Sequence, residues 1–302
     1  MLSGVKTADI IAIVVTHDSA AALPPCLAAL ARQGVAAIVV DNASRDDSAS
    51  IAERAGARVI RNARNEGYGR AMNIGMRAAA SVPALAGSAG LCLLLNPDLV
   101  LDPGSVAALE QAALRYPRSG LLAPRLIEPD GRLFYQARSL LAPYLRNQAG
   151  APCSPEGDCC APFLSGACLV GDCGFLLSIG GFDETIFLFY EDDDLCRRVI
   201  EAGRPLLHVH GAVARHARGA SSAKAPGRIF RSRWHMAWSE GYVARKYRLP
   251  EDSWRTLAVN AVKFCAATLT FNRDRMERYA GSAAGAYSWL RGRSALAREG
   301  LA

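Results

Sequence analysis

The sequence predicts an α/β protein with a mainly parallel central sheet and a helical C-terminal tail, and three observations lead to this fold class. Apolar, largely β-branched or leucine-rich runs alternate with helical stretches over residues 10–98. Polar side chains follow the ends of these runs, and the charge pattern changes near residue 224. Continuous apolar strands that alternate with helices indicate a parallel sheet covered on both faces.

The elements follow one another as strand and helix from the N-terminus. We expect strands at 10–15, 37–40, 58–60 and 91–95, and helices at 21–33, 46–55, 69–79 and 195–202, the last closed by Gly203 as a C-cap. Residues 143–162 are rich in Pro, Gly, Ala and Cys without a clear period, which predicts a mobile loop. Residues 219–227 have a linker composition and lead into the tail.

The composition is that of a globular protein rather than a disordered chain or a disulfide miniprotein. The chain has 302 residues, of which 51% are hydrophobic and 21% charged. Lys6 and Asp9 precede the first apolar run, so we expect no secretory signal. No uncharged apolar run reaches the length of about 18 residues that a membrane span needs.

The nine cysteines favour free thiols in a reducing cytoplasm. Their number is odd and no Cys-x-x-Cys pair occurs, so neither a disulfide framework nor a zinc knuckle is indicated. Five of them lie close together in the sequence: Cys153, Cys159, Cys160, Cys168 and Cys173. Ordinary thiols are favoured over a metal site there, and the role of this group stays open.

The basic charge belongs to the tail. The formal net charge is +7, but residues from Lys224 to the end contain 15 basic and 6 acidic side chains, a net +9. The tail also holds an apolar helical pattern, formed by Leu257, Ala261, Phe264, Thr268 and Phe271. Such a helix packs on the preceding domain, lies on a membrane surface or forms a dimer contact, and the sequence leaves these alternatives open.

Polar side chains gather after three successive strands. They are Thr16 and His17, Asp41 and Asn42, and Asn96 and Asp98. Each one alone would serve as a turn residue or helix N-cap. Three such clusters in succession favour a ligand site, because ligands of parallel sheets bind beyond the carboxyl ends of the strands.

Two further stretches carry chemistry. Residues 65–75 contain glycines and asparagines suited to close approach of a ligand, yet they match neither a Rossmann nor a Walker motif. The acidic run Glu191 to Asp194 follows an aromatic stretch, which favours a carboxylate cluster in a cleft over a solvated helix end. A partly desolvated carboxylate near others gains proton affinity, as a general base requires.

Four other side chains have less specific patterns. Asp98 is a hard oxygen ligand that suits Mg²⁺ or Mn²⁺, or else caps a turn. His216 is a lone histidine, and His208 and His210 are expected to be core or sheet-edge residues.

Together these motifs resemble the family 2 glycosyltransferases, particularly their rhamnosyltransferase-like branch. They occur in the order of the family over residues 10–222: Val15-Thr16-His17, Val39 to Ser44, Asn65 to Gly75, Leu95 to Asp98, Gly180 to Glu184 and Glu191 to Leu195. The resemblance implies a GT-A type nucleotide-sugar-binding domain over residues 1–222 and a basic helical region over residues 223–302.

The resemblance also implies an activity. It is the inverting transfer of rhamnose or a similar sugar from a dTDP- or UDP-sugar donor to a saccharide or lipid-linked saccharide acceptor, in cell-surface polysaccharide synthesis. We expect a cytoplasmic enzyme, either free or peripheral at the inner face of the membrane. An anionic membrane surface and a second copy of the chain are candidate partners, and nucleic acid is not expected.

The site residues follow by position in the family pattern. Asp192 would be the catalytic base, and Asp98 with His216 would hold a divalent metal, Mn²⁺ or Mg²⁺. The nucleotide-sugar site would comprise Thr16, His17, Asp41, Asn42, Asn65, Gly67, Asn73, Asn96 and Asp98. The acidic cluster beside the base would comprise Glu191, Asp193 and Asp194.

Two other functions stay open at this point. A nucleotidyltransferase also combines an α/β nucleotide fold with a metal, but its glycine-rich phosphate loop with a basic residue is missing near the N-terminus. A catalytically degenerate sugar-nucleotide-binding or scaffold protein would share the fold, but the intact Asp98 and Asp192 argue against it.

Overall fold

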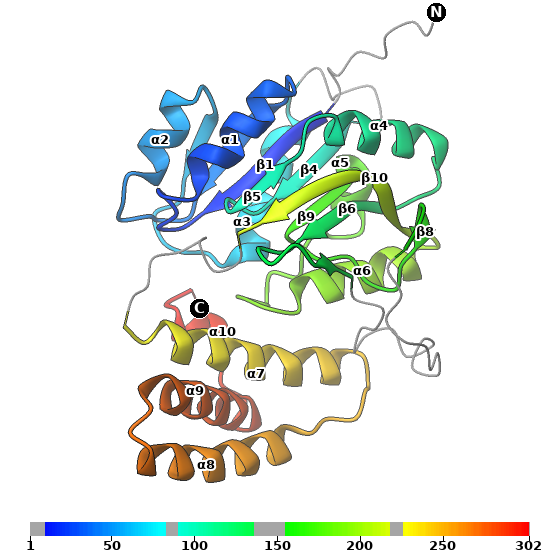
Figure 1. Ribbon diagram of the computed structural model, residues 1–302. Helices are drawn as coiled ribbons and strands as arrows, with labels where there is room; N and C mark the ends of the chain where they lie inside the picture. The colour runs from blue at the N-terminus through cyan, green and yellow to red at the C-terminus, as the bar shows by residue number, and fades with distance from the viewer. Residues whose placement is uncertain (1–9, 83–89, 136–154, 218–225, 302) are drawn as a thin grey trace, which may run out of the picture.

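A mixed β-sheet forms the centre of the molecule (Figure 1). The computed structural model describes residues 10–82, 90–135, 155–217 and 226–301. The strands are β1 (Ile10–Thr16), β2 (Ala36–Asp41), β3 (Arg58–Arg61), β4 (Leu91–Leu95), β5 (Leu99–Leu101), β6 (Leu121–Ile127), β7 (Leu133–Phe134), β8 (Cys159–Cys160), β9 (Cys168–Asp172) and β10 (Leu206–His216). The order is β3-β2-β1-β4-β9-β6-β10-β5, with β7 beside β6 and β8 beside β10.

The first half of the sheet is parallel, as predicted. Strands β1, β2, β3 and β4 run parallel to one another. Strand β9 then enters antiparallel between β4 and β6, while β6 and β10 are again parallel to each other. The local pattern of apolar residues could not predict these strand directions, because a buried strand has the same composition whether it is parallel or antiparallel to its neighbours.

Helices cover both faces of the sheet. They are α1 (Leu23–Arg32), α2 (Ser48–Arg54), α3 (Tyr68–Ala80), α4 (Ser105–Arg115), α5 (Cys173–Ser178) and α6 (Glu191–Glu201). Side chains of α1, α2 and α4 share one core cluster, and those of α3, α5 and α6 share the other. Along β1 the side chains alternate between the two clusters, with Ile10, Ala12 and Val14 on one face and Ile11, Ile13 and Val15 on the other.

The tail forms a group of helices below the sheet in Figure 1. They are α7 (Arg228–Lys246), α8 (Ser253–Leu269), α9 (Arg273–Leu290) and α10 (Ala295–Arg298). Their core is aromatic and includes Trp234, Trp238 and Trp289. Phe187, which precedes α6, is buried in the same cluster, so the tail packs on the catalytic part of the chain.

The structure corrects two of the expected boundaries. Helix α6 begins at Glu191, four residues before the expected start, because its acidic side chains occupy the first turn and complement the helix dipole. The expected loop at 143–162 includes strand β8, which pairs with β10. The rest of that loop up to residue 154, and most of the expected linker at 219–227, lie outside the described residues. Among the helices that are described, none combines the length and the apolar character of a membrane span.

Candidate active site

Buried polar atoms without hydrogen-bond partners lie at the carboxyl edge of the sheet. They are Oγ1 of Thr16 at the end of β1, Oδ1 of Asp41 at the end of β2, and Oδ1 of Asp98 just beyond β4. Thr16 and Asp41 are partners in the register of the two strands. A buried polar group left unpaired costs about 1–3 kcal/mol. Several at one edge therefore indicate a site built for a polar ligand.

The amide of Asn42 holds the loop that follows β3. Its Nδ2 donates to Oδ1 of Asn65 at 2.9 Å and to the carbonyl of Gly67 at 3.1 Å. Its Oδ1 accepts from Nδ2 of Asn62 at 3.0 Å and from the backbone N–H of Glu66 at 2.9 Å. Both hydrogens of the amide and both lone pairs of its oxygen are used. Asn42 is thus an anchor of this loop, and Asn62 is a member of the site that the sequence analysis missed.

Gly67 allows the start of α3 to approach the segment before α6. Its φ is +84°, and a Cβ on it would lie 2.5 Å from the carbonyl oxygen of Phe187. The N–H of Tyr68 donates to that same oxygen at 3.1 Å. On the other side, His17 contacts the carbonyl of Asn42 through Nδ1 at 2.9 Å. Four of the residues expected around the nucleotide are therefore connected by hydrogen bonds: His17, Asn42, Asn65 and Gly67.

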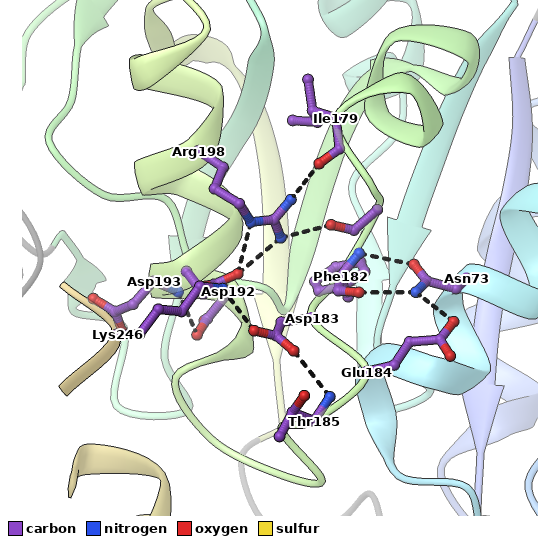
Figure 2. A network of polar contacts seen from close by, with 12 residues as sticks. Asn73, Ile179, Phe182, Asp183, Glu184, Thr185, Asp192, Asp193, Arg198 and Lys246 are labelled. Carbon is purple, nitrogen blue, oxygen red and sulfur yellow. Dashed lines mark hydrogen bonds and ion pairs between the residues drawn. The ribbon is translucent and has the colours of Figure 1, made fainter. Parts of the chain in front are cut away.

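Asn73 has partners other than those expected. Its Oδ1 accepts from the N–H of Phe182 at 2.8 Å, and its Nδ2 donates to the carbonyl of Phe182 at 2.9 Å and to Oε1 of Glu184 at 3.0 Å (Figure 2). The amide is committed to the Gly180 to Glu184 turn. In this structure Asn73 secures that turn instead of lining the nucleotide pocket.

Asp98 and His216 come together through strand pairing. β5 is antiparallel to β10, and its register places His216 opposite Leu99. Nε2 of His216 lies 3.4 Å from Oδ1 of Asp98, and the N–H of Ala217 donates to the carbonyl of Asp98 at 3.0 Å. Asp98 is buried. The pairing of β5 with β10 thus brings together Asp98 and His216, which are far apart in the sequence.

Glu191 and Asp192 are adjacent carboxyls in different environments. Asp192 accepts from the N–H of Gly166 at 2.8 Å and from that of Asp193 at 3.0 Å. Burial raises the pKa of Asp192, and these two N–H groups oppose the rise. Glu191 is buried with Oε2 unpartnered, and burial, followed by the charge of Asp192, raises its pKa to about 8. Burial thus raises the pKa of both carboxyls, while the N–H groups of Gly166 and Asp193 stabilise the charged form of Asp192.

The backbone of Gly166 and Ala167 connects the two halves of the site. The carbonyl of Ala167 accepts from the N–H of Asn96 at 2.9 Å, while the N–H of Gly166 binds Asp192. The hydroxyl of Tyr68 donates to the carbonyl of Gly166 at 2.7 Å. Burial raises the pKa of Tyr68, and the charges of Glu191, Asp192 and Asp98 add to the rise. Asn96, Asp192 and Tyr68 are therefore all hydrogen-bonded to the backbone of residues 166–167.

Asp194 joins α6 to the tail. This buried carboxylate accepts from Nε of Arg198 at 2.8 Å, from the hydroxyl of Tyr247 at 2.7 Å and from Nζ of Lys246. Lys246 also donates to Asp183 at 2.6 Å (Figure 2). Asp194 was expected in the acidic cluster of the active site. The structure gives its carboxylate three partners, two of them on or next to α7.

The backbone before α6 is in a strained conformation. Phe189 and Tyr190 have φ values of 67° and 69°, which residues other than glycine seldom adopt. Such strain persists only where the surroundings over-determine it. Helix α7 provides them: Ser239 donates to the carbonyl of Leu188 at 3.0 Å, and the ring of His235 stacks on Phe187 at 4.6 Å.

Sequence reasoning missed the residues that α7 contributes. His235, Ser239 and Lys246 contact residues more than 40 positions away, and nothing in the local pattern of a basic helix identifies such partners. Gly166 was also missed. Only its place in a short turn before a strand signals that its N–H is available.

The pH dependence of stability offers a test of the buried Glu191. Because its pKa is raised from 4.5 to about 8, the folded state retains a proton that the unfolded state loses in this range. The free energy of unfolding should therefore fall as the pH rises from about 4.5 to about 8. Glu191→Gln removes this contribution, so the difference between the two proteins in urea titrations should change across that window and then level off. Parallel profiles would place the proton elsewhere.

The cysteines and the two remaining histidines take structural positions. The described cysteines are free, and no group of three or more His, Cys, Asp and Glu side chains forms a metal site among the described residues. Cys153 lies outside them. His208 of β10 is buried against Tyr135, and His210 is half-buried and donates its backbone N–H to Asp158.

Comparisons with known proteins agree with this geometry. A family model described as glycosyl transferase family 2 matches residues 11–168. A curated N-acetylglucosaminyl-diphospho-decaprenol L-rhamnosyltransferase of Mycobacterium tuberculosis is 31% identical, over 72% of this chain and 79% of the relative.

Solved structures show the same fold at low identity. GalNAc-T7 crystallised with UDP, GalNAc and Mn²⁺ superposes with a TM-score of 0.55 and 14% identity, over 83% of this chain and 50% of that one. A mycobacterial protein superposes with a TM-score of 0.50 and 18% identity, over 82% of this chain and 78% of that one. These likenesses confirm the expected GT-A type fold.

Proposed function

The chain belongs to glycosyl transferase family 2 and is a glycosyltransferase; from this premise we propose that it transfers rhamnose or a similar sugar with inversion. The donor would be a dTDP- or UDP-sugar. The acceptor would be a saccharide, most simply a lipid-linked one, since the name of the M. tuberculosis relative specifies such an acceptor. The product would serve cell-surface polysaccharide synthesis.

One observation carries the proposal. The backbone of residues 166–167 binds the Asp192 carboxylate on one side and the end of β4 on the other. The proposal is supported by this link, since it joins a carboxyl of raised pKa to the edge where Thr16, Asp41 and Asp98 have buried polar atoms without hydrogen-bond partners. A base next to a polar nucleotide site is what direct displacement from a sugar diphosphate requires.

The proposed step balances as follows. An acceptor hydroxyl oxygen forms a bond to the anomeric carbon while the bond from that carbon to the diphosphate oxygen breaks. Attack occurs opposite the leaving group, which inverts the configuration. The hydroxyl proton passes to the carboxylate of Asp192, and the nucleoside diphosphate leaves with the bonding electrons. Thr16 and Asp41 orient the nucleoside part of the donor in this proposal.

The residues at the end of β4 fit a divalent cation. Oδ1 of Asp98 is buried without a hydrogen-bond partner, and Nε2 of His216 lies 3.4 Å from it. A carboxylate and an imidazole suit Mn²⁺ or Mg²⁺ when the diphosphate supplies the remaining oxygens. A bound cation would neutralise charge on the leaving diphosphate. Asp98 and His216 are the residues that would hold it.

Binding of nucleotide in the presence of metal tests this assignment. A thermal-shift panel of nucleoside diphosphates and sugar nucleotides, with Mn²⁺ and with EDTA, should show stabilisation of the folded protein by dTDP or UDP compounds. At a ligand concentration 100 times Kd the stabilisation is about 2.7 kcal/mol. A panel in which no nucleotide raises the melting temperature would contradict the proposal.

Variants at the metal site should separate charge from a neutral ligand. Asp98→Ala should abolish the Mn²⁺-dependent part of diphosphate binding, whereas His216→Ala should weaken it less, because the carboxylate supplies charge and the imidazole only a lone pair. Equal diphosphate binding with EDTA and with Mn²⁺ in the unaltered protein would exclude the assignment.

The proposed acceptor also bears on where the enzyme works. A lipid-linked saccharide is held in a membrane, so we place the reaction in the cytoplasm at the inner face of that membrane, with the protein attached peripherally. The alternative proposal is that the tail forms the contact of a homodimer.

A further inference from the structure

Helix α8 is the outermost element of the tail. α7 packs on the segment before α6, and α9 packs on α7, where glycines such as Gly281 and Gly285 meet the α7 backbone. α8 packs on α9 and hardly touches α7. In Figure 1 it lies at the far edge of the molecule from the sheet. One side of α8 is therefore covered by α9, and the opposite side faces outward.

The outward side of α8 is apolar. Trp254, Val262 and Leu269 are 71%, 70% and 81% exposed, and Phe271 just beyond the helix is 89% exposed. The small or apolar side chains that continue this side, all exposed, are Ala258, Val259, Ala261, Cys265 and Ala266. The spacing of three and four residues aligns them along one stripe, about 25 Å long at 1.5 Å per residue.

This stripe is unusual within the molecule. Of the seven large hydrophobic side chains exposed among the described residues, five lie between positions 254 and 271. Tyr287 is a sixth, on the neighbouring helix, and only Leu114 lies on the catalytic domain. Isolated exposed apolar side chains are ordinary, but a contiguous set marks an interaction surface.

Exposed cations without ion pairs lie on α8 itself and in the first two turns of α9. Arg255, Lys263, Arg273, Arg275 and Arg278 are exposed, and none of them forms an ion pair with any described residue. In α7, by contrast, Arg231 pairs with Glu299, Arg245 with Glu251, and Lys246 with Asp183 and Asp194. Three cations of α7 are thus paired with carboxylates, whereas these five cations of α8 and α9 are not.

We propose that the outward face of α8, together with Phe271, docks on an anionic lipid surface. An apolar stripe flanked by cations is the pattern of helices that lie in the membrane interface, where anionic lipid attracts basic side chains. A second copy of the chain fits less well, because it would bring two sets of unpaired cations together. This inference deepens the proposed function and depends on it only for the membrane-bound acceptor.

The tryptophans provide a direct signal of docking. The chain has four, and Trp234, Trp238 and Trp289 are buried while Trp254 is exposed. The full-length protein added to phosphatidylglycerol–phosphatidylcholine vesicles should show a blue shift of fluorescence emission together with vesicle co-sedimentation. Trp254→Phe should remove most of the shift while retaining co-sedimentation. A shift that persists in Trp254→Phe would place the contact elsewhere.

Surface substitutions test the stripe without disturbing the core. The triple variant Val262→Ser, Leu269→Ser and Phe271→Ser should lower vesicle affinity at least tenfold, because burial of such side chains drives interfacial binding. Leu114→Ser, at a similarly exposed position on α4, is the matched control and should bind as the unaltered protein does. Lys263→Gln and Arg273→Gln should each weaken binding about fivefold, an effect that 0.5 M salt removes.

Three outcomes would overturn the proposal. They are vesicle binding by the triple variant equal to that of the unaltered protein, no binding to anionic vesicles at low salt, and a dimer in sedimentation that the triple variant converts to a monomer. Nucleotide thermal shifts on the same proteins keep this result separate from the proposed function. If nucleotides still raise the melting temperature of a variant that no longer binds vesicles, the docking surface is supported. If nucleotides do not raise the melting temperature while vesicle binding is intact, only the enzyme assignment is contradicted.

Discussion

Replacement of Asp192 by Asn should lower turnover by about 10² or more and leave nucleotide binding nearly unchanged, since a positioned general base contributes about that factor. The amide oxygen of Asn retains one acceptor for the N–H of Gly166, so the turn that supports the residue should persist. Sugar transfer measured at saturating donor gives the loss of turnover, and thermal shifts with nucleoside diphosphate give the binding.

The neighbouring acidic residue supplies the control. Asp193→Asn removes a charge one position further along α6 and should reduce turnover far less than Asp192→Asn. The base assignment fails if Asp192→Asn retains near-normal turnover, or if the two variants lose activity equally.

Replacement of Asp194 by Asn should destabilise the protein by about 3–5 kcal/mol, the cost of breaking a buried ion pair by removing one partner. The Asp194 side chain is fully buried, and its removal leaves Arg198 and Lys246 without their shared carboxylate. Urea denaturation measures the loss. In a double-mutant cycle with Lys246→Met, the second substitution should cost less once the first is present, because only the ion pair of Lys246 with Asp183 is then left to break.

Asp102 provides a matched surface pair. It accepts two bonds from Arg215 at 2.9 Å, but the Arg215 side chain is 62% exposed. Asp102→Asn should therefore cost less than about 1 kcal/mol. If Asp194→Asn were no more costly than this control, the buried network would not be what joins α6 to the tail.

The sequence was sufficient for the fold class, the family and most of the element positions. The strand at 91–95 occurs as predicted, because a run of buried apolar residues bounded by polar ones has few alternatives. The antiparallel entry of β9 was not predicted, since strand direction depends on partners distant in the sequence. The placement of α7 beside the segment that precedes α6 was missed for the same reason.

The site residues divide along similar lines. The closeness of Asp98 and His216 followed from the resemblance and is seen in the structure at 3.4 Å. The partners of Asn73 and Asp194 did not follow, because an amide or a carboxylate has the same letter in a sequence whether it faces a ligand or a neighbouring element. Only the packing of the Gly180 to Glu184 turn and of α7 reveals that these two groups are already occupied.

The contact between Phe187 and the aromatic core of the tail decides where this chain can be recombined with a relative. Ile186 packs on Val243, and Phe187 packs among tryptophans of the tail. A chimera joined at residue 222 would place the tail of a relative against the native segment 186–190. The contacts that hold Phe189 and Tyr190 in their strained conformation would then be lost. A chimera that exchanges residues 186–190 along with the tail keeps both sides of the contact from one parent. The tail is therefore best transferred between relatives together with residues 186–190, as a two-part unit.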